Sequence, residues 1–229
     1  MLCKHGVTSS NLVSSTNTIC MIIVSVKDPR SIVRNYKYLK EFEKELYIKY
    51  FPKENEREPL KNIIDRIWNN SYPKSDILLL VENDKVIAGC ISDFYAKCKS
   101  IEPIYLVVDE EHRNKGLARD MIEIVFSRDG VDDMYVEADN PELVELSETS
   151  IDPKLRLNIY NKLGFDVLDI NYVQPPLDKG MDFEKGLVLM CKTKNPPITK
   201  GRIKTFLTEF YDSLGCLDTD EYRELIKDL

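Results

Sequence analysis

The sequence predicts an α/β fold in which strands and helices alternate along most of the chain. Short apolar runs of strand length recur at residues 77–81, 86–91 and 104–108. Apolar residues spaced by three or four positions, the period of a helix, occupy several of the segments between and around these runs. No apolar run approaches the roughly 18 residues that a membrane helix needs, so we expect a soluble protein with no membrane partner.

Strand and helix signals follow one another from the first part of the chain. A strand is expected at residues 22–26, and a helix between Ser31 and Phe51. The apolar face of that helix carries Ile32, Tyr36, Leu39, Phe42, Leu46 and Tyr50. A shorter helix opens at Pro59, because proline suits the first helical position. Its apolar side carries Leu60, Ile63, Ile64, Ile67 and Trp68.

The middle of the chain predicts a hairpin followed by further strands and helices. The hairpin joins residues 77–81 to 86–91 through the turn-forming pair Asn83 and Asp84. A strand at 101–108, a helix over 118–125 and a strand at 134–136 come next. The acidic segment 137–152 predicts a loop.

The last third begins with a helix whose two ends are marked by the sequence. Asp152 can cap it, Pro153 fits its first position and Gly164 can take the left-handed stop. Residues 165–173 and 187–191 then predict a closing pair of strands.

Two amphipathic helices finish the chain after Asn195. We therefore expect a disordered tail at 1–20, one domain at 21–194 and a helical extension at 195–229. The aromatic residues of the extension are expected to pack either on the domain or on a second subunit, which leaves a homodimer open.

Charge and cysteine content limit the functional classes. The 39 acidic and 32 basic residues give a net charge of −7, which disfavours nucleic acid and favours a cationic or small-molecule partner. The six cysteines are scattered, so we expect reduced thiols and a cytoplasmic protein. With two histidines and no Cys-x-x-Cys pair, we expect no metal.

The most informative stretch is an apolar strand, a polar turn and a helix that begins at Gly116. A helix N-terminus exposes unpaired backbone N–H groups and about half a positive charge, so it can receive a pyrophosphate. Arg113 and Lys115 add cationic donors at the same place.

Two motifs resemble those of the GNAT superfamily of acetyl-CoA-dependent N-acetyltransferases. Arg113, Gly116 and Ala118 match its Arg/Gln-x-x-Gly-x-Gly/Ala signature, and Tyr160 begins a Tyr-x-x-x-Gly-Phe element. The resemblance covers roughly residues 22–193. It implies a mixed, mostly antiparallel sheet with splayed central strands and helices on both faces.

The resemblance also implies roles for particular residues. The pyrophosphate of acetyl-CoA would lie on Arg113, Asn114, Lys115, Gly116, Leu117 and Ala118. Leu106, Val107 and Val108 would line the pantetheine arm and the thioester. A phenol with a pKa of about 10 can protonate a departing thiolate of pKa roughly 8.5, which makes Tyr160 the candidate acid.

The base that deprotonates the amine is less well defined by the sequence. Glu102 shares a strand face with Ile104, Leu106 and Val108, and some family members carry a catalytic glutamate there. The alternative is a solvated carboxylate with bulk water as the base. The acidic segment 137–152 is a candidate rim that attracts a protonated amine.

The chain departs from many family members at Pro153 and Arg156, where they place asparagine and alanine. Arg156 is therefore expected to contact either a phosphate or an acidic side chain. The acceptor is expected to be a primary amine of a small molecule or peptide. The competing hypothesis is a catalytically silent module that binds acyl-CoA.

Overall fold

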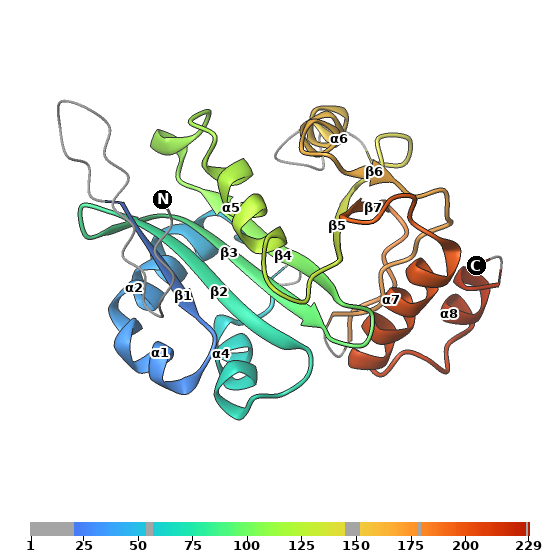
Figure 1. Ribbon diagram of the computed structural model, residues 1–229, viewed down its shortest axis with the longest axis horizontal. Helices are drawn as coiled ribbons and strands as arrows, with labels where there is room; N and C mark the ends of the chain where they lie inside the picture. Colours follow the sequence, from blue (N-terminus) through green and yellow to red (C-terminus); the bar gives the residue numbers. More distant parts are fainter. Residues whose placement is uncertain (1–20, 54–56, 145–151, 178–179, 228) are drawn as a thin grey trace. The chain divides into compact units, whose positions relative to one another are not determined.

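The computed structural model describes residues 21–53, 57–144, 152–177, 180–227 and 229 (Figure 1). The predicted tail at 1–20 lies outside them. The strands are β1 (Met21–Val26), β2 (Lys74–Glu82), β3 (Lys85–Tyr95), β4 (Ser100–Val108), β5 (Asp133–Asp139), β6 (Asp166–Val167) and β7 (Leu187–Thr193).

The described strands form one seven-stranded sheet of order β1-β2-β3-β4-β5-β7-β6. β4 and β5 pair in parallel, whereas β1 is antiparallel to β2, and β7 is antiparallel to both β5 and β6. The mixed, mostly antiparallel sheet of the prediction is thus confirmed.

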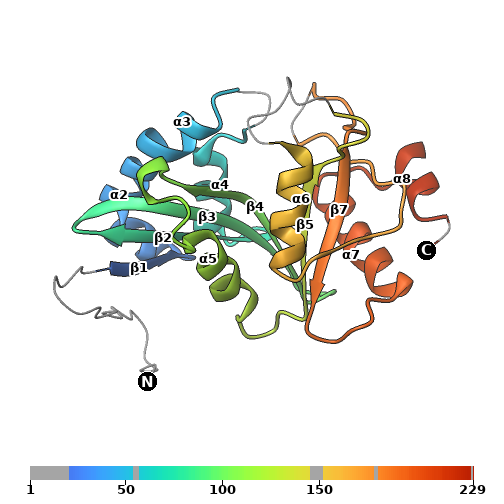
Figure 2. The ribbon, with the colours of Figure 1, turned by 90° about the horizontal axis from the view of Figure 1, so that it is seen from above.

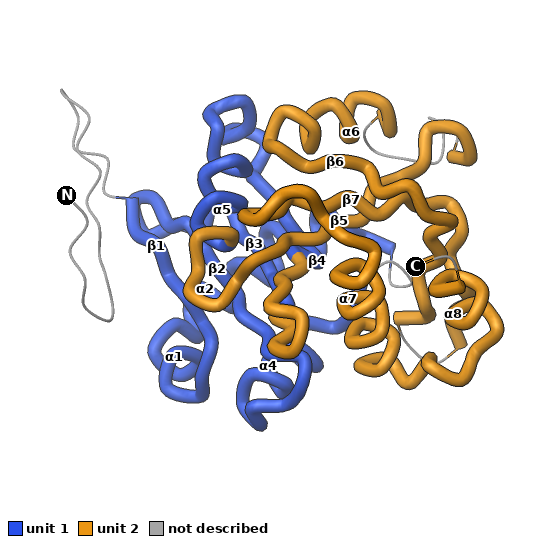
Figure 3. The backbone as a smooth tube through the Cα atoms, turned by 45° about the vertical axis from the view of Figure 1, so that its right-hand side comes forward, with its two compact units in different colours: residues 1–93, 103–125 blue, residues 94–102, 126–229 orange. Residues whose placement is uncertain are grey.

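The chain divides into two compact units (Figure 3). Unit 1 takes the residues up to 93 together with 103–125, and unit 2 takes 94–102 together with 126–229. β3 and β4 each contribute residues to both units. The boundaries expected at 20 and 194, and the splay of the central strands, stay predictions.

The helix predicted over 31–51 is divided into four short segments. These are α1 (Pro29–Arg34), α2 (Tyr36–Glu41), the π-helical segment η1 (Phe42–Tyr47) and α3 (Ile48–Tyr50). In a π-helix residues five apart lie on one face. Phe42 and Tyr47 are accordingly both buried, with ring centroids 5.7 Å apart. Tyr36, expected on the apolar face, is 54% exposed.

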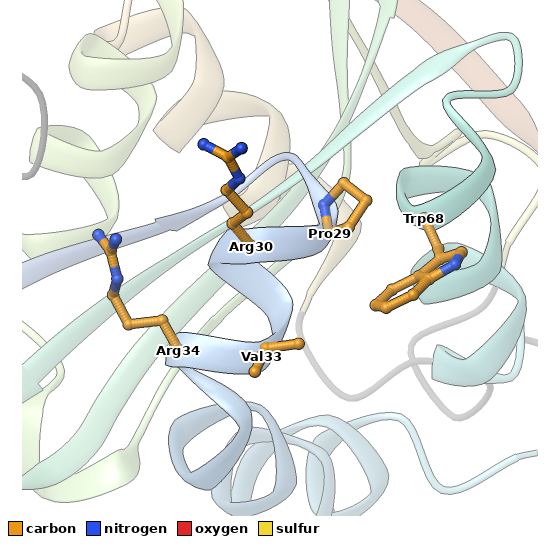
Figure 4. Close-up of a pocket in the computed structure, with 5 residues that line it drawn as sticks. All are labelled: Pro29, Arg30, Val33, Arg34 and Trp68. Atoms are coloured by element: carbon orange, nitrogen blue, oxygen red, sulfur yellow. The ribbon is translucent and has the colours of Figure 1, made fainter.

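The next helix of unit 1 in the described part of the chain, α4 (Leu60–Asn69), follows Pro59 at its N-cap. Leu60, Ile63 and Ile67 are buried as predicted, but Trp68 is 52% exposed. Figure 4 shows Trp68 across from Pro29 and Val33 of α1, in a shallow hollow of about 490 Å³ that Arg30 and Arg34 also line.

Close packing against the sheet fixes the first helices of unit 1. α1 contacts β1, and α4 contacts β2, while α5 (Leu117–Phe126) lies on the other face of these strands (Figure 1). Gly89 of β3 lies against the ring of Phe42, and a Cβ there would stand 2.2 Å from Phe42 Cε2. Between β2 and β3, Asn83 and Asp84 have φ of 50° and 65°, as the predicted hairpin turn requires.

Unit 2 places helices on both faces of β5 and β7. α6 (Pro153–Lys162) lies on one face, and α7 (Lys200–Ser213) with α8 (Asp220–Leu225) lies on the other (Figures 1 and 2). The ring of Tyr135 on β5 stacks on Phe206 of α7 at 3.8 Å. The carboxylate of Glu209 on α7 accepts bonds from the amides of Lys97 and Cys98. The C-terminal helices therefore pack on unit 2.

Two predictions for unit 2 need correction. Residues 137–139, predicted as the start of a loop, belong to β5 because they continue its pairing with β7. The strand predicted at 165–173 is limited to the two residues of β6 and is followed by an isolated bridge between Gln174 and Glu184.

The cysteines of the described residues are free. Cys90 and Cys191 are buried, whereas Cys98 and Cys216 are half-buried. Burial raises the pKa of the Cys191 thiol to about 12. Cys3 and Cys20 lie outside the described residues. In the part of the chain that the structure describes, no helix is both long and apolar enough to cross a membrane.

Candidate functional site

The turn between β4 and α5, in unit 1, is built by local backbone geometry. The amide of Asp109 donates to the carbonyl of Ile87 at 2.9 Å, which fixes the end of β4. A single 3₁₀ turn over 110–112 follows. Asn114 and Gly116 then take positive φ values of 61° and 83°, which turn the chain into α5. The glycine is required here because the left-handed region is costly for other residues.

The first amides of α5 are open. Asp120 is the first residue of α5 whose amide has a backbone acceptor. It donates to the carbonyl of Gly116 at 3.0 Å. Among the described residues, no acceptor is found for the amides of residues 114–119. Such a group of unpaired N–H donors at a helix start is an anion-binding arrangement. The binding of a pyrophosphate at this turn stays a prediction.

Arg113 is held at the rim of this turn. Its guanidinium lies 4.8 Å from the ring centroid of Tyr50, and its Nε donates to the carbonyl of Val108 at 3.2 Å. The hydroxyl of Tyr50 in turn accepts from the amide of Glu110 at 3.0 Å. Arg113 and Lys115 are both exposed, so two cations flank the open amides.

The strand leading to the turn alternates in burial. Tyr105 and Val107 are buried in the core of unit 1, whereas Leu106 and Val108 are half-buried. The side chain of Val107 is thus a core group, and its predicted contact with the thioester would be through the backbone. Leu106 and Val108 occupy the opposite, more open face.

Tyr160 belongs to unit 2 and lies near the end of α6. The helix has the ends that the sequence predicted: the carboxylate of Asp152 accepts from the amide of Lys154 at 2.9 Å, and Gly164 has φ of 87°. Tyr160 is half-buried, and its ring meets Phe165 edge to face at 5.5 Å. One turn earlier, Arg156 bonds to Asp139 of β5 at 2.8 Å. Arg156 thus contacts an acidic side chain, as one of the two alternatives predicted, and a contact with a phosphate stays a prediction.

Glu102 is 2% exposed, so the alternative of a solvated carboxylate is wrong. It lies on the short part of β4 that belongs to unit 2. The hydroxyl of Tyr95 donates to its carboxylate at 3.2 Å.

A second glutamate of unit 2, which sequence reasoning had assigned to the acidic rim, lies in an organised cluster. Glu137 on β5 accepts hydrogen bonds from the hydroxyl of Tyr172 and from Nε2 of Gln174. Burial raises the pKa of the Glu137 carboxyl to about 7, although both hydrogen bonds act to lower it. Burial and the charges of Glu137 and Glu102 raise the pKa of Tyr172.

The structure groups the predicted residues into two sets. The turn residues 113–118 and the end of β4 belong to unit 1, and Tyr160 and Glu102 belong to unit 2.

Of the expected acidic rim, Glu142 is exposed, while Glu145 and Glu148 lie outside the described residues. Within the described ranges, no group of three or more His, Cys, Asp or Glu side chains could hold a metal ion.

The central part of the chain is similar to a known protein family. Residues 73–167, from β2 to β6, match the family model described as the acetyltransferase (GNAT) domain. The match covers 95 of the 229 residues and includes both motifs that resemble this family.

Solved structures share the fold at low sequence identity. A GNAT-family acetyltransferase from Bacteroides thetaiotaomicron has a TM-score of 0.59 at 18% identity, over 83% of this chain and 97% of its own. GCN5 from Tetrahymena has a TM-score of 0.51 at 16% identity, over 77% and 98%. An aminoglycoside 6′-acetyltransferase of type Ii has 0.51 at 16%, over 76% and 99%. No curated protein sequence matches the chain.

Proposed function

We propose that the protein transfers an acetyl group from acetyl-CoA to a primary amine of a small molecule or peptide. The observation that carries the proposal is the set of open amides at the start of α5, flanked by the exposed Arg113 and Lys115. Backbone N–H groups and side-chain cations suit a diphosphate, and this cradle directly follows an open strand face that suits a pantetheine arm.

With the diphosphate at the start of α5 and the pantetheine arm along β4, the other contacts of acetyl-CoA follow. The amides and side chains of residues 113–118 receive the pyrophosphate, and the backbone of Leu106 and Val108 holds the pantetheine. An N–H near Val107 or Val108 polarises the thioester carbonyl, which is worth on the order of 10²–10³ in rate.

The chemical step needs no covalent intermediate on the enzyme. The neutral amine attacks the thioester carbon, a C–N bond forms, and the C–S bond breaks as the thiolate leaves. Tyr160 donates its phenolic proton to the thiolate and regains one from solvent. The reaction takes place in a ternary complex, and we place it in the cytoplasm on the basis of the free cysteines.

Two measurements test the proposal. Calorimetry with CoA should show binding to the folded protein, and release of free thiol from acetyl-CoA should depend on an added amine from a panel of amino sugars, polyamines, lysine and peptides. Absence of CoA binding would reject the cradle. Tight binding without turnover across the panel would support the silent acyl-CoA module instead.

A further inference from the structure

A shallow hollow between α1 and α4, both of unit 1, keeps large apolar side chains exposed. Trp68 of α4 faces Pro29 and Val33 of α1 across it (Figure 4), and Trp68 and Val33 are 52% and 67% exposed. Its volume of about 490 Å³ lies within the roughly 300–1,000 Å³ of ligand-binding pockets. Single exposed apolar side chains are common on protein surfaces, but grouped ones with a polar rim mark interaction sites.

The charged residues that line this hollow are two arginines. Arg30 and Arg34 lie four residues apart on α1, so their side chains leave the same face of the helix one turn apart. Both are exposed, and among the described residues neither guanidinium has a hydrogen bond or an ion pair. The carboxylate closest to them in the sequence, that of Asp28, accepts a hydrogen bond from the amide of Ser31 at 2.8 Å as the N-cap of α1. No direct contact with the described part of the chain therefore neutralises either arginine.

Other cations of the first helices do have carboxylate partners. Lys37 of α2 pairs with Asp84, and Nζ of Lys49 on α3 lies 3.2 Å from the carboxylate of Glu110. The chain as a whole carries 39 acidic residues and 32 basic ones. Although carboxylates are in excess, the two arginines beside the hollow remain available to carboxylates from outside the chain, with which guanidinium groups form strong hydrogen bonds.

We propose that the hollow between α1 and α4 binds an acidic segment of a partner protein, whose apolar side chain packs against Trp68 and whose carboxylates pair with Arg30 and Arg34. Tryptophan and arginine are among the side chains that most often dominate the binding energy of protein interfaces. Because the arginines lie one turn apart, carboxylates four residues apart on a partner helix match their spacing. A shallow hollow suits a segment that lies across α1 better than a small molecule, which a pocket encloses more completely.

This hollow is separate from the turn that is proposed to bind acetyl-CoA. α1 and α4 pack on one face of the strands of unit 1, whereas α5 lies on the other face (Figure 1). The inference therefore does not depend on acetyl transfer, and a bound partner would leave the first amides of α5 open. An anionic membrane would use the same positive charges, but a concave apolar surface fits an inserted side chain better than a flat lipid surface.

Trp68 is the single tryptophan of the chain, so its fluorescence reports on the hollow in the wild-type protein. The ligand for the test is a tryptophan-free helical peptide on an alanine background, with leucines on one stripe and glutamates four residues apart on the neighbouring stripe. Its binding should shift the emission of Trp68 to shorter wavelength and reduce quenching by acrylamide, because the exposed part of the ring leaves water. The same peptide with lysines in place of the glutamates should not bind. If the glutamate peptide at millimolar concentration leaves the spectrum unchanged, or if both peptides change it alike, the proposal is wrong.

A double substitution tests the two arginines. Arg30→Gln combined with Arg34→Gln should weaken the affinity for the glutamate peptide roughly 2- to 30-fold, the effect of losing two exposed ion pairs. The matched control is Arg223→Gln combined with Lys227→Gln, which removes two exposed cations that are also four residues apart, in and just after α8 of unit 2. The control should bind the peptide as the wild type does. Equal affinities of the two double variants would overturn the proposal.

Trp68→Ala tests the apolar contact, with calorimetry as the readout because the variant lacks the fluorophore. It should lower the affinity about 10-fold or more. Tyr36→Ala, which removes an exposed aromatic ring of α2 outside the hollow, should not change it. Both rings are more than half exposed, so circular dichroism should show an intact fold in each variant. An unchanged affinity of Trp68→Ala would contradict the proposed contact.

Vesicles distinguish a protein partner from a membrane. Vesicles of phosphatidylcholine with phosphatidylglycerol are added to the wild-type protein, and the emission of Trp68 is measured as before. We expect no shift with these vesicles and a shift with the glutamate peptide. A shift with the vesicles and none with the peptide would replace the proposed protein partner with an anionic membrane surface.

Discussion

Replacing Gly116 with alanine would separate backbone strain from coenzyme binding. Gly116 has φ of +83°, in the left-handed region, where an L-residue costs roughly 1–2 kcal/mol. A Cβ there would stand 3.2 Å from Nη2 of Arg119, the flexible end of a side chain, so the backbone term dominates. For a chain of this size the cost corresponds to a fall in Tm of about 2–8 °C.

The loss of CoA binding should exceed what this strain explains. If residue 116 leaves the left-handed region, the amides that open α5 change direction. Each hydrogen bond that they donate to a charged phosphate oxygen contributes about 1.5–3 kcal/mol. Loss of one such bond would weaken CoA binding roughly 10- to 100-fold, which calorimetry resolves.

Gly215→Ala is the matched control for this experiment. Gly215 also has a positive φ, +70°, and a Cβ there would meet no described atom within 4 Å. It should lower Tm by a similar amount and leave CoA affinity unchanged. If Gly116→Ala bound CoA as tightly as Gly215→Ala does, the reasoning that places the diphosphate on this turn would be refuted.

Three further substitutions test other parts of the structure. Tyr160→Phe should lower turnover about 10²-fold and leave CoA affinity nearly intact, and steady-state kinetics with unchanged kcat would exclude it as the acid. Arg66→Met leaves the buried Asp93 without its ion partner and should cost up to about 3 kcal/mol at pH 7. Burial raises the folded-state pKa of Asp93, so stability falls as pH rises; urea unfolding should show a smaller loss at pH 5, and equal losses would contradict this. Gly89→Ala forces the ring of Phe42 to move and should cost about 1–3 kcal/mol, so an unchanged Tm would count against the close contact.

Elements marked by local chemistry could be predicted from the sequence. The pair Asn83 and Asp84 gave the hairpin, and Asp152 with Gly164 gave both ends of α6, because these residue types favour those backbone conformations on their own. The division of the helix over 31–51 could not be predicted in this way. The π-turn that buries both Phe42 and Tyr47 depends on packing, including the fit of Phe42 over Gly89, and no local signal encodes it.

The candidate site likewise contains residues that a local signal predicts and residues whose contacts depend on distant parts of the chain. The motif at Arg113 and Gly116 located the turn, because a glycine with positive φ before a helix is a local requirement. The hydrogen-bonded cluster around Glu137 was not predicted, because an acidic run suggests a solvated loop. The alternation of Tyr135, Glu137 and Asp139 was a signal for a continued strand, but the partner Tyr172 lies 35 residues further along the chain.

The two units are interwoven along the chain. Their three boundaries, after residues 93, 102 and 125, fall inside β3, β4 and α5. A recombinant fragment that ended at any of them would break a strand or helix, and neither unit is one uninterrupted stretch of polypeptide. Truncations and chimeras of this protein are therefore best joined in the loops between elements, and the two halves cannot be exchanged as simple cassettes.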